Sequence, residues 1–248
     1  MLIAERQDKI VRMVEKRGSV QVEELAKELD VSTMTIRRDL EKLNAQGMIN
    51  RCHGGAVSKN EVIYADKRIR NSEIKGQLAK ACYKYVKESN VVFLDAGTTT
   101  YEIAKLISHV PEITVVTNDI EIAKLLLDSP ADLIICGGQV QKSTGSTHGY
   151  YTTQMIEFLR FDIGFFGTAA IDEDLNVMTP TTDKAFLKRM AVQKSQNSFL
   201  VADHSKFHST ALTFVNKITD YDNIVTDFEF PKDAIKEVRK TGTNVIQI

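Results

Sequence analysis

The sequence predicts an α/β protein of two domains. The first is small and built on two helices across a tight turn; the second is larger and doubly wound, with a mainly parallel sheet. The 248 residues exceed what one compact domain usually needs. Apolar residues recur at helical spacing over residues 22–43. From residue 73 onward, β-branched apolar runs alternate with helix-like segments, which is typical of a parallel sheet covered on both faces.

The C-terminal pattern predicts its elements individually, beginning with a helix over residues 73–88. The predicted strands are continuous apolar runs that end in small or polar residues, and they cover residues 91–94, 113–117, 133–136, 161–166, 199–202 and 223–226. The predicted helices between them cover residues 101–107, 120–127, 151–159 and 182–195. We therefore assign residues 73–248 to a doubly wound α/β domain.

Composition excludes several classes of protein. The chain is 43% hydrophobic and 26% charged, and its net charge of −1 argues against nonspecific coating of nucleic acid. The three cysteines are scattered without metal-ligand spacing, and the pair His204 and His208 lacks a third ligand, so we expect no metal and no other cofactor. Without a signal peptide or an apolar run of membrane length, the chain is expected to be cytoplasmic and free of the membrane.

The pattern of residues 22–43 predicts a helix-turn-helix motif. The first helix is amphipathic, and Asp30-Val31 turns the chain. Ser32 is a good N-cap, because its hydroxyl can accept a backbone N–H from the first turn of the second helix. The second helix has a predicted buried stripe of Ile36, Leu40 and Leu43. A preceding helix over residues 1–17 has a predicted core stripe of Ile3, Ile10, Val11 and Val14.

The second helix has the side chains of a helix that reads the major groove of DNA. Residues 32–59 carry five basic residues against two acidic ones, a local charge of +3. The predicted contacts combine hydroxyls, a thioether and two arginines: Ser32, Thr33, Met34, Thr35, Arg37 and Arg38. Arginine can fork onto guanine or grip a phosphate. The alternative is a solvated helix surface on which the arginines pair with Asp39 or Glu41.

Two short extended pieces around Gly54-Gly55 predict a hairpin over residues 48–57, which would act as a wing beside the motif. Arg51 and His53 are its candidate DNA contacts, through the backbone or the minor groove. Each could instead be an ordinary surface or hairpin residue. We assign residues 1–57 to the winged helix-turn-helix domain and the polar residues 58–72 to a linker.

The loop after the strand 91–94 is the strongest signal for a small ligand, because ligands of open parallel sheets bind at the carboxyl ends of strands. Its glycine permits close backbone approach, and its threonines offer hydroxyls beside a helix N-terminus that attracts anions. The candidate residues are Asp95, Gly97, Thr98, Thr99 and Thr100. An ordinary strand-to-helix turn with threonine caps is the alternative.

Other candidates follow neighbouring strands and should reach the same rim of the sheet. They are Asn118, Gly137, Gly138, Asp203 and Lys206. An acidic and a basic group after residue 202 could bind sugar hydroxyls and phosphate, or could form a local ion pair. Lys188 is a weaker candidate, and the polar loop 139–149 could close over a ligand or be only a connection.

Taken together, these motifs resemble the DeoR family of bacterial transcriptional regulators. The resemblance rests on Thr35-Ile36-Arg37-Arg38-Asp39-Leu40, the wing His53-Gly54-Gly55-Ala56, and Asp95-Ala96-Gly97-Thr98-Thr99, with further matches to about residue 207. It implies a winged helix-turn-helix that binds double-stranded operator DNA. It also implies a sensor domain, resembling sugar-phosphate isomerases, that binds a phosphorylated sugar. The chain departs from the family at Asp183-Lys184, where a lysine stands in place of an acidic residue on the pocket side.

We therefore expect a transcriptional regulator, by family habit a repressor of a sugar-metabolism operon, that works as a homodimer or higher homo-oligomer. The alternative is a sugar-phosphate isomerase-like enzyme fused to a DNA-binding domain. Asp95, Asp183 or Asp203 could in principle act as a base in such an enzyme. No convincing acid–base pair emerges, so no catalytic residue is assigned.

Overall fold

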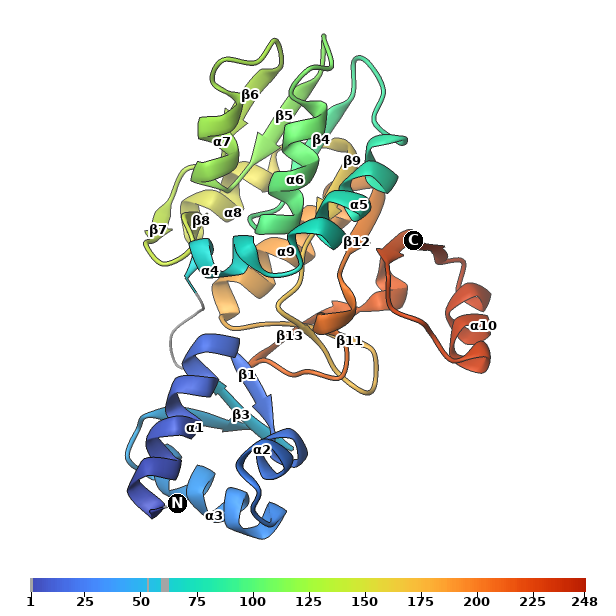
Figure 1. The fold of residues 1–248 in the computed structure, drawn as a ribbon. Helices are drawn as coiled ribbons and strands as arrows, with labels where there is room; N and C mark the ends of the chain where they lie inside the picture. Colours follow the sequence, from blue (N-terminus) through green and yellow to red (C-terminus); the bar gives the residue numbers. More distant parts are fainter. Residues whose placement is uncertain (1, 53, 59–62) are drawn as a thin grey trace.

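A computed structural model describes residues 2–52, 54–58 and 63–248. It divides them into a small winged helix-turn-helix and a larger parallel α/β domain, as the sequence predicts (Figure 1). The elements of the N-terminal part are α1 (Ile3–Arg17), β1 (Ser19–Gln21), α2 (Val22–Leu29), α3 (Thr33–Ala45), β2 (Ile49–Cys52) and β3 (Gly55–Ser58).

The predicted helix-turn-helix forms with its expected cap and core. Ser32 Oγ accepts the Thr35 N–H at 3.2 Å, and Asp30 adopts the left-handed conformation in the turn. The predicted stripe of α3 is buried against α1, α2 and the wing, in a core that contains Ile10, Val14, Leu25, Ile36, Leu40, Leu43 and Ile49.

One predicted core position of α1 is wrong. Ile3 is 59% exposed, because the helix turns Arg6 inward instead. The guanidinium Nε of Arg6 lies 2.6 Å from Asp39 Oδ2, and Gln7 donates to the other carboxylate oxygen at 2.8 Å. Since both charged groups are nearly buried, this ion pair fixes α3 against α1. Asp39 is thereby withdrawn from the arginines beside it on α3.

The wing is a three-stranded antiparallel sheet in the order β1-β3-β2. Gly55 is required where β3 crosses β1, because a Cβ there would lie 2.0 Å from the carbonyl oxygen of Val20. Gly54 occupies the turn with φ of +78°, a conformation that glycine adopts without strain. The fold of the wing therefore explains why glycine stands at both positions.

The C-terminal domain is built on a seven-stranded parallel sheet in the order β15-β14-β12-β9-β4-β5-β6. Its strands are β4 (Val91–Leu94), β5 (Thr114–Thr117), β6 (Asp132–Ile135), β9 (Phe161–Phe166), β12 (Ser195–Val201), β14 (Asn223–Thr226) and β15 (Asn244–Gln247). Every pairing is parallel, and the carboxyl ends of β4, β5, β9 and β12 therefore meet at one edge.

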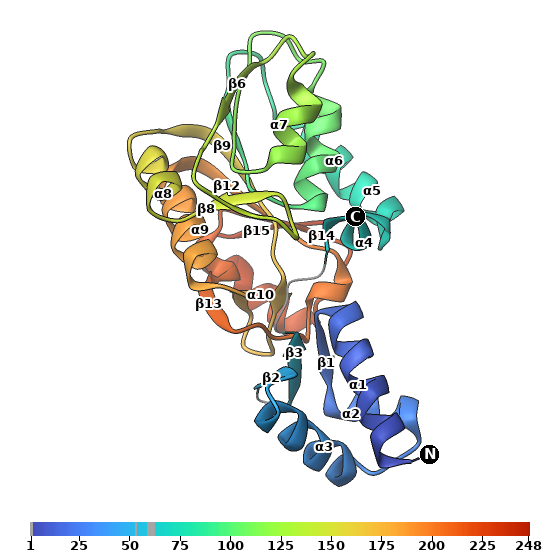
Figure 2. The same cartoon turned by 90° about the vertical axis from the view of Figure 1, so that its left-hand side faces the viewer.

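Helices cover both faces of this sheet (Figures 1 and 2). One face carries α5 (Ser72–Tyr83), α6 (Thr98–Ile107) and α7 (Ile120–Leu126), whose apolar residues pack with Val92, Val115 and Phe165. The other carries α8 (Tyr150–Glu157), α9 (Thr182–Lys194) and α10 (Lys232–Lys240), which pack with Phe93, Phe166 and Leu200. None of the described helices is both long and apolar enough to cross a membrane.

Several elements were not predicted from the sequence. The linker contains a short helix, α4 (Tyr64–Ile69), and α5 begins one residue before its predicted start. A hairpin of β7 (Gln139–Gln141) and β8 (Ser146–His148) occupies the predicted polar loop, and 3-10 turns lie at His204–Lys206 and Ile218–Asp220. A second small sheet contains β10 (Ala170–Ile171), β11 (Asn176–Thr179) and β13 (Thr213–Lys217). In Figure 1 it lies between the parallel sheet and β1.

The Arg6–Asp39 pair leads to a test of stability. Asp39→Ala leaves the Arg6 guanidinium nearly buried without its counter-charge, so we expect a loss of about 3–5 kcal/mol of unfolding free energy. Glu41→Ala is the matched control, because the exposed Glu41–Arg51 pair should contribute no more than about 1 kcal/mol. Urea unfolding of both variants, followed by circular dichroism, measures the difference; equal stabilities would contradict the role of Arg6.

Candidate functional site

The outer face of α3 presents the predicted DNA-contacting residues. Thr33, Met34, Arg37 and Arg38 are exposed, and Met34 is 56% exposed although it is apolar. Neither arginine has an ion-pair partner among the residues that the structure describes. Asp39 pairs with Arg6 instead, and Glu41 pairs with Arg51 at 3.0 Å. The two guanidinium groups are therefore available to a ligand outside the protein.

The side chains of Ser32 and Thr35 stabilise the first turn of α3. Their hydroxyl oxygens lie 2.9 Å apart, and the Ser32 hydroxyl also caps the helix. In the wing, the backbone N–H of Arg51 donates to Asn44 Oδ1 at 2.9 Å. The exposed side chain of Arg51 lies beside α3, where it contacts Glu41. His53 lies outside the described residues. DNA contact by these residues stays a prediction.

A cavity of about 810 Å³ lies where the two domains meet. The N-terminal domain contributes Arg17, Gln21 and Glu24 to its wall, and the α/β domain contributes the carboxyl ends of β4, β9 and β12 with the loops that follow them. Its charged lining comprises seven basic and two acidic residues: Arg17, Lys67, Arg70, Lys75, Lys184, Lys188, Lys206, Glu24 and Asp203. Such a wall favours an anionic ligand.

The loop after β4 is held from behind by the strand end beside it. Asn118 Oδ1 accepts the N–H of Ala96 at 3.0 Å, and Asp119 Oδ2 accepts that of Gly97 at 3.0 Å. The Thr100 hydroxyl donates back to the carbonyl of Asp95 at 2.6 Å. The first amides of α6, from Thr98 to Thr100, have no acceptor within the helix and lie at its positive end.

Gly97 is not required by the fold. Its φ of 165° is extended backbone, and an added Cβ would make only ordinary contact with Thr100 Oγ1 at 3.5 Å. Gly138 differs, since its Cβ would lie 2.1 Å from Thr152 Oγ1. Any need for glycine at position 97 must come from the cavity that it lines.

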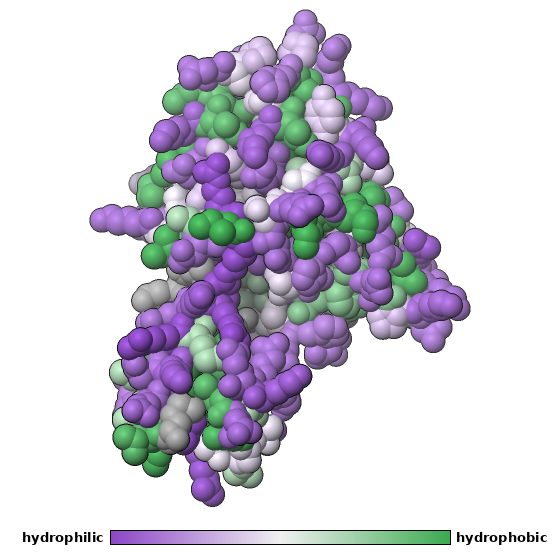
Figure 3. Space-filling model, in the orientation of Figure 1, coloured by the Kyte–Doolittle hydropathy of each residue, from purple (hydrophilic) through white to green (hydrophobic). Residues whose placement is uncertain are grey.

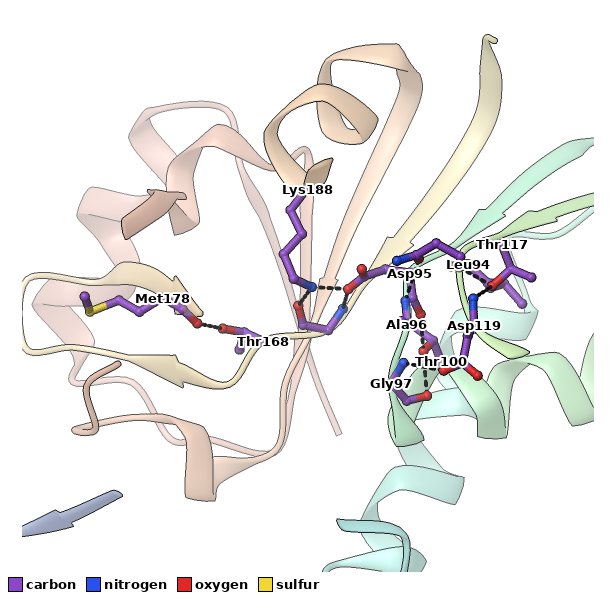
Figure 4. A network of polar contacts seen from close by, with 12 residues as sticks. Leu94, Asp95, Ala96, Gly97, Thr100, Thr117, Asp119, Thr168, Met178 and Lys188 are labelled. Carbon is purple, nitrogen blue, oxygen red and sulfur yellow. Dashed lines mark hydrogen bonds and ion pairs between the residues drawn. The ribbon is translucent and has the colours of Figure 1, made fainter. Parts of the chain in front are cut away.

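A buried ion pair closes the floor of the site (Figure 4). Asp95, only 1% exposed, receives the ammonium of Lys188 from α9 and the N–H of Gly167 at 3.1 Å. The same lysine donates to the Gly167 carbonyl at 2.8 Å. Asp95 therefore joins the ends of β4 and β9 to α9 and fixes the start of the loop.

Burial raises the pKa of Asp119 to about 6, and nearby Asp95 adds to the rise. The amides of Ile122, Glu121 and Gly97 act in the opposite direction by donating to its carboxylate. This carboxyl group is thus placed to titrate close to neutral pH directly behind the loop.

The opposite wall joins the linker to the loop after β12. Asn71, in the left-handed conformation with φ of 49°, donates to Asp203 Oδ1 at 2.8 Å and contacts Ser205 Oγ at 3.3 Å. Burial would raise the pKa of Asp203, but adjacent Lys206 and the hydrogen bonds from Ser205 and Asn71 lower it overall. Lys75 is buried and donates to the Arg70 carbonyl at 2.6 Å. Its pKa is lowered to about 8 by burial and then by Lys206.

The structure brings half of the predicted effector residues to the cavity wall: Gly97, Thr98, Thr99, Lys184, Asp203 and Lys206. The others do not line it. Asp95, Thr100 and Asn118 support the loop from behind, Gly137 and Gly138 pack against Thr152, and Asp183 is exposed on α9. As ligand contacts, all of them stay predictions.

Sequence reasoning missed Asn71, Lys75 and Asp119. Asp119 follows a predicted strand end directly, so its position was a usable signal. Asn71 and Lys75 lie in and after a segment assigned as linker, and no local pattern marks them. Among the residues that the structure describes, no cluster of three or more histidine, cysteine or carboxylate side chains is suited to a metal ion.

Comparison with known proteins gives matches along nearly the whole chain. A family model described as the DeoR-like helix-turn-helix domain matches residues 6–62, and one described as the DeoR C terminal sensor domain matches residues 70–228. The chain is 34% identical to the HTH-type transcriptional regulator GlpR of Haloferax volcanii, covering 99% of this chain and 98% of that protein. It is 31% identical to the glycerol-3-phosphate regulon repressor of Haemophilus influenzae, covering 97% and 95%.

Among solved structures, ribose 5-phosphate isomerase A from Methanocaldococcus jannaschii is similar with a TM-score of 0.41 and 17% identity, covering 55% of each chain.

The position of Asp119 predicts a pH dependence of stability. Its folded-state pKa of about 6 lies above the ordinary 3.8, so the protonated carboxyl favours folding. This contribution is complete below about pH 4 and is lost as the pH rises through 6. Asp119→Asn cannot titrate at this position. The unfolding free energy of wild type minus that of the variant should therefore fall by about 2 kcal/mol between about pH 4 and about pH 7. Urea unfolding across this range measures it, and a constant or rising difference would contradict the raised pKa.

Proposed function

The chain belongs to the DeoR family of transcriptional regulators, and on this premise we propose that it represses an operator under the control of a phosphorylated sugar bound in the cavity between its domains. DNA binding and transcriptional regulation follow from the family. The direction of regulation, the class of effector and the residues that contact each ligand are proposals.

Helix α3 is proposed to enter the major groove of the operator. Thr33 and Met34 lie in its first turn, where base edges and thymine methyl groups are nearest in this class of motif. Arg37 and Arg38 extend the same exposed surface by a turn, so one guanidinium can fork onto guanine while the other holds a phosphate. The wing, through Arg51 and His53, is proposed to add contacts beside the groove.

The observation that carries the effector proposal is the charge of the cavity wall, which includes the amino end of α6. Seven basic and two acidic residues line this cavity, although Arg17 and Lys188 already pair with carboxylates outside the lining. Helix N-termini bind phosphate through free amides, and the hydroxyls of Thr98 and Thr99 lie in that same turn. The cavity volume suits a small molecule. A phosphate seated there would also favour the charged form of Lys75, whose pKa is lowered to about 8 in its absence.

The polar wall beyond the phosphate position supports a sugar or polyol. Asp203 and the hydroxyls of Thr168, Thr179 and Ser205 line the same cavity, and such groups hydrogen-bond hydroxyl groups of a ligand. A related protein is named for a glycerol-3-phosphate regulon, which agrees with a phosphorylated polyol or sugar as the class of effector.

We propose that the effector acts through contacts that already join the cavity to the DNA-binding domain. The Gln21 side chain donates to the carbonyl of His208, in the loop that lines the cavity after Asp203. In the linker, Arg70 reaches the last carbonyl of α1 at 3.4 Å, and the next residue, Asn71, binds Asp203. A ligand that rearranges Asp203 or Ser205 would therefore bias the placement of the winged helix.

A catalytic role is not supported by any specific observation. A proton-transfer enzyme needs a base that can reach its substrate. The Asp95 carboxylate is already engaged by Lys188 and Gly167, and Asp119 is turned toward the backbone of the loop. Asp183 is exposed and does not line the cavity. Asp203 does line it, but its lowered pKa makes its carboxylate a weak base. We propose that the cavity binds its ligand without turnover.

Removal of one α3 arginine tests the proposed DNA surface. Arg38→Ala should weaken operator binding by about 1–3 kcal/mol while leaving effector binding unchanged, because no residue of α3 lines the cavity. Arg12→Ala is the control, since it removes another exposed arginine, from α1. Fluorescence anisotropy with a labelled operator measures both. Equal affinities for the two variants would remove Arg38 from the DNA-binding surface.

The phosphate position is tested by replacing hydroxyls without changing side-chain shape. Thr98→Val combined with Thr99→Val should weaken binding of a phosphorylated sugar at least about tenfold, since each lost hydrogen bond to a charged group contributes about 1.5–3 kcal/mol. Operator affinity without effector should remain that of the wild type. Thr114→Val is the control, because Thr114 lies at the amino end of β5 and does not line the cavity. Calorimetric affinities equal to that of the control would place the phosphate elsewhere.

A further inference from the structure

One outer surface of the α/β domain is unusually apolar. It is formed by α8, α9 and the start of β13, which pack against one another in succession (Figure 2). Tyr151 and Met155 of α8 and its C-cap residue Phe158 follow each other at the spacing of one helix face and are 74%, 37% and 84% exposed. Tyr150 packs edge-to-face on Tyr151, and Phe186 of α9 is 62% exposed. We call these residues, with Phe214 of β13, the α8–α9 face.

Arg189 fixes α9 and β13, the two elements that complete this surface beside α8, relative to each other. Arg189 of α9 donates to the Phe214 carbonyl at 2.6 Å and also to the Val215 carbonyl. Its guanidinium lies 5.3 Å from the Phe214 ring centroid and 6.0 Å from that of Phe186. Since α9 and β13 are joined in this way, the aromatic rings are presented on a preformed surface, which lowers the entropy cost of association.

The opposite helical layer has a different character. Fewer large apolar side chains are exposed there in the described chain: Tyr83 at the end of α5, Tyr85 just after it, and Leu127 just after α7. The face shown in Figure 3, which carries these helices, is largely hydrophilic with separated apolar patches. The apolar character of the α8–α9 face is therefore local to one side of the sheet, not a general property of the surface.

The size of the α8–α9 face fits a protein partner. Large aromatic side chains bury about 150–250 Å² each, so the exposed fractions of its five aromatic residues amount to roughly 500–850 Å². The largest apolar patch of a typical monomer is only about 300–600 Å². A stable interface buries about 800 Å² on each partner and is enriched in tyrosine, phenylalanine, methionine and arginine.

We propose that the α8–α9 face is the dimer interface and that its occupant is the same face of a second copy of this chain. The choice of a second copy rests on the proposed function, because two winged helices are needed to read paired operator half-sites. It also rests on the area, whose upper value reaches that of one side of a stable dimer. An isologous contact through this face lies outside both α3 and the cavity, so both copies keep their DNA surface and effector site open.

The test is the assembly state of the full-length chain, measured without DNA by sedimentation velocity and by light scattering after size exclusion. The wild type is expected to be a dimer or a larger even-numbered assembly. Phe158→Glu, which places a charge within the proposed apolar interface, is expected to raise the dimer dissociation constant by about 30-fold or more. Tyr151→Glu should act in the same direction. Leu127→Glu is the matched control, since Leu127 is 72% exposed after α7 in the opposite layer, and it should leave assembly unchanged.

Circular dichroism spectra identical to that of the wild type confirm that each variant is folded, and Phe158→Ala supplies a milder change if a charged variant does not fold. A monomeric wild type overturns the proposal, as does a dimer that persists in every folded variant of Phe158 and Tyr151. If assembly is unaffected in the variants while operator binding is intact, the interface is wrong and the proposed function stands. If Phe158→Glu dissociates a dimer that binds no operator, the interface stands and the proposed function is wrong.

Discussion

The buried carboxylate of Asp95 is the constraint on which the site depends. A charge that is 1% exposed needs a counter-charge and hydrogen bonds, and the chain supplies Lys188 from α9 and the amide of Gly167. Removing one partner of a buried pair costs about 3–5 kcal/mol, so the ends of β4 and β9 have one stable arrangement around this group. That arrangement sets the direction of the loop up to Gly97, and hence where the free amides of α6 point. The phosphate position that we propose is a consequence of this pair.

A second constraint arises from placing the cavity at a domain boundary. Its wall includes residues of α1 and α2, the linker and the loop after β12. Arg70 and Asn71 are neighbours in the chain, yet one contacts α1 and the other contacts Asp203. Asn71 adopts the left-handed conformation, which asparagine tolerates, and its side-chain contacts with Asp203 and Ser205 hold the linker at this point. In our proposal, occupancy of the cavity and placement of the winged helix are therefore linked through one short segment.

The sequence predicted those features that depend on local pattern. The stripe of Ile36, Leu40 and Leu43, the Ser32 cap and the parallel strands all follow from periodicity and turn chemistry. Arg6 was missed because its burial depends on Asp39, far along the chain, and no helical pattern marks a charged core residue. The β10-β11-β13 sheet was missed because its pairings join distant short segments.

For the site, the rule that ligands bind at the carboxyl ends of parallel strands correctly placed Gly97, Thr98 and Asp203 at the cavity. It could not separate them from Thr100 and Asn118, which support the loop, because all of them follow strand ends.

The most direct test of the account is the operator affinity of the full-length chain across a panel of phosphorylated sugars and polyols, each compared with its unphosphorylated parent. The account predicts that at least one phosphorylated compound lowers operator affinity in a saturable manner, and that its parent does not at the same concentration. It also predicts that Thr98→Val with Thr99→Val shifts the response to higher effector concentration. An operator affinity that no phosphorylated compound changes, or one that the unphosphorylated parent changes equally, would contradict it.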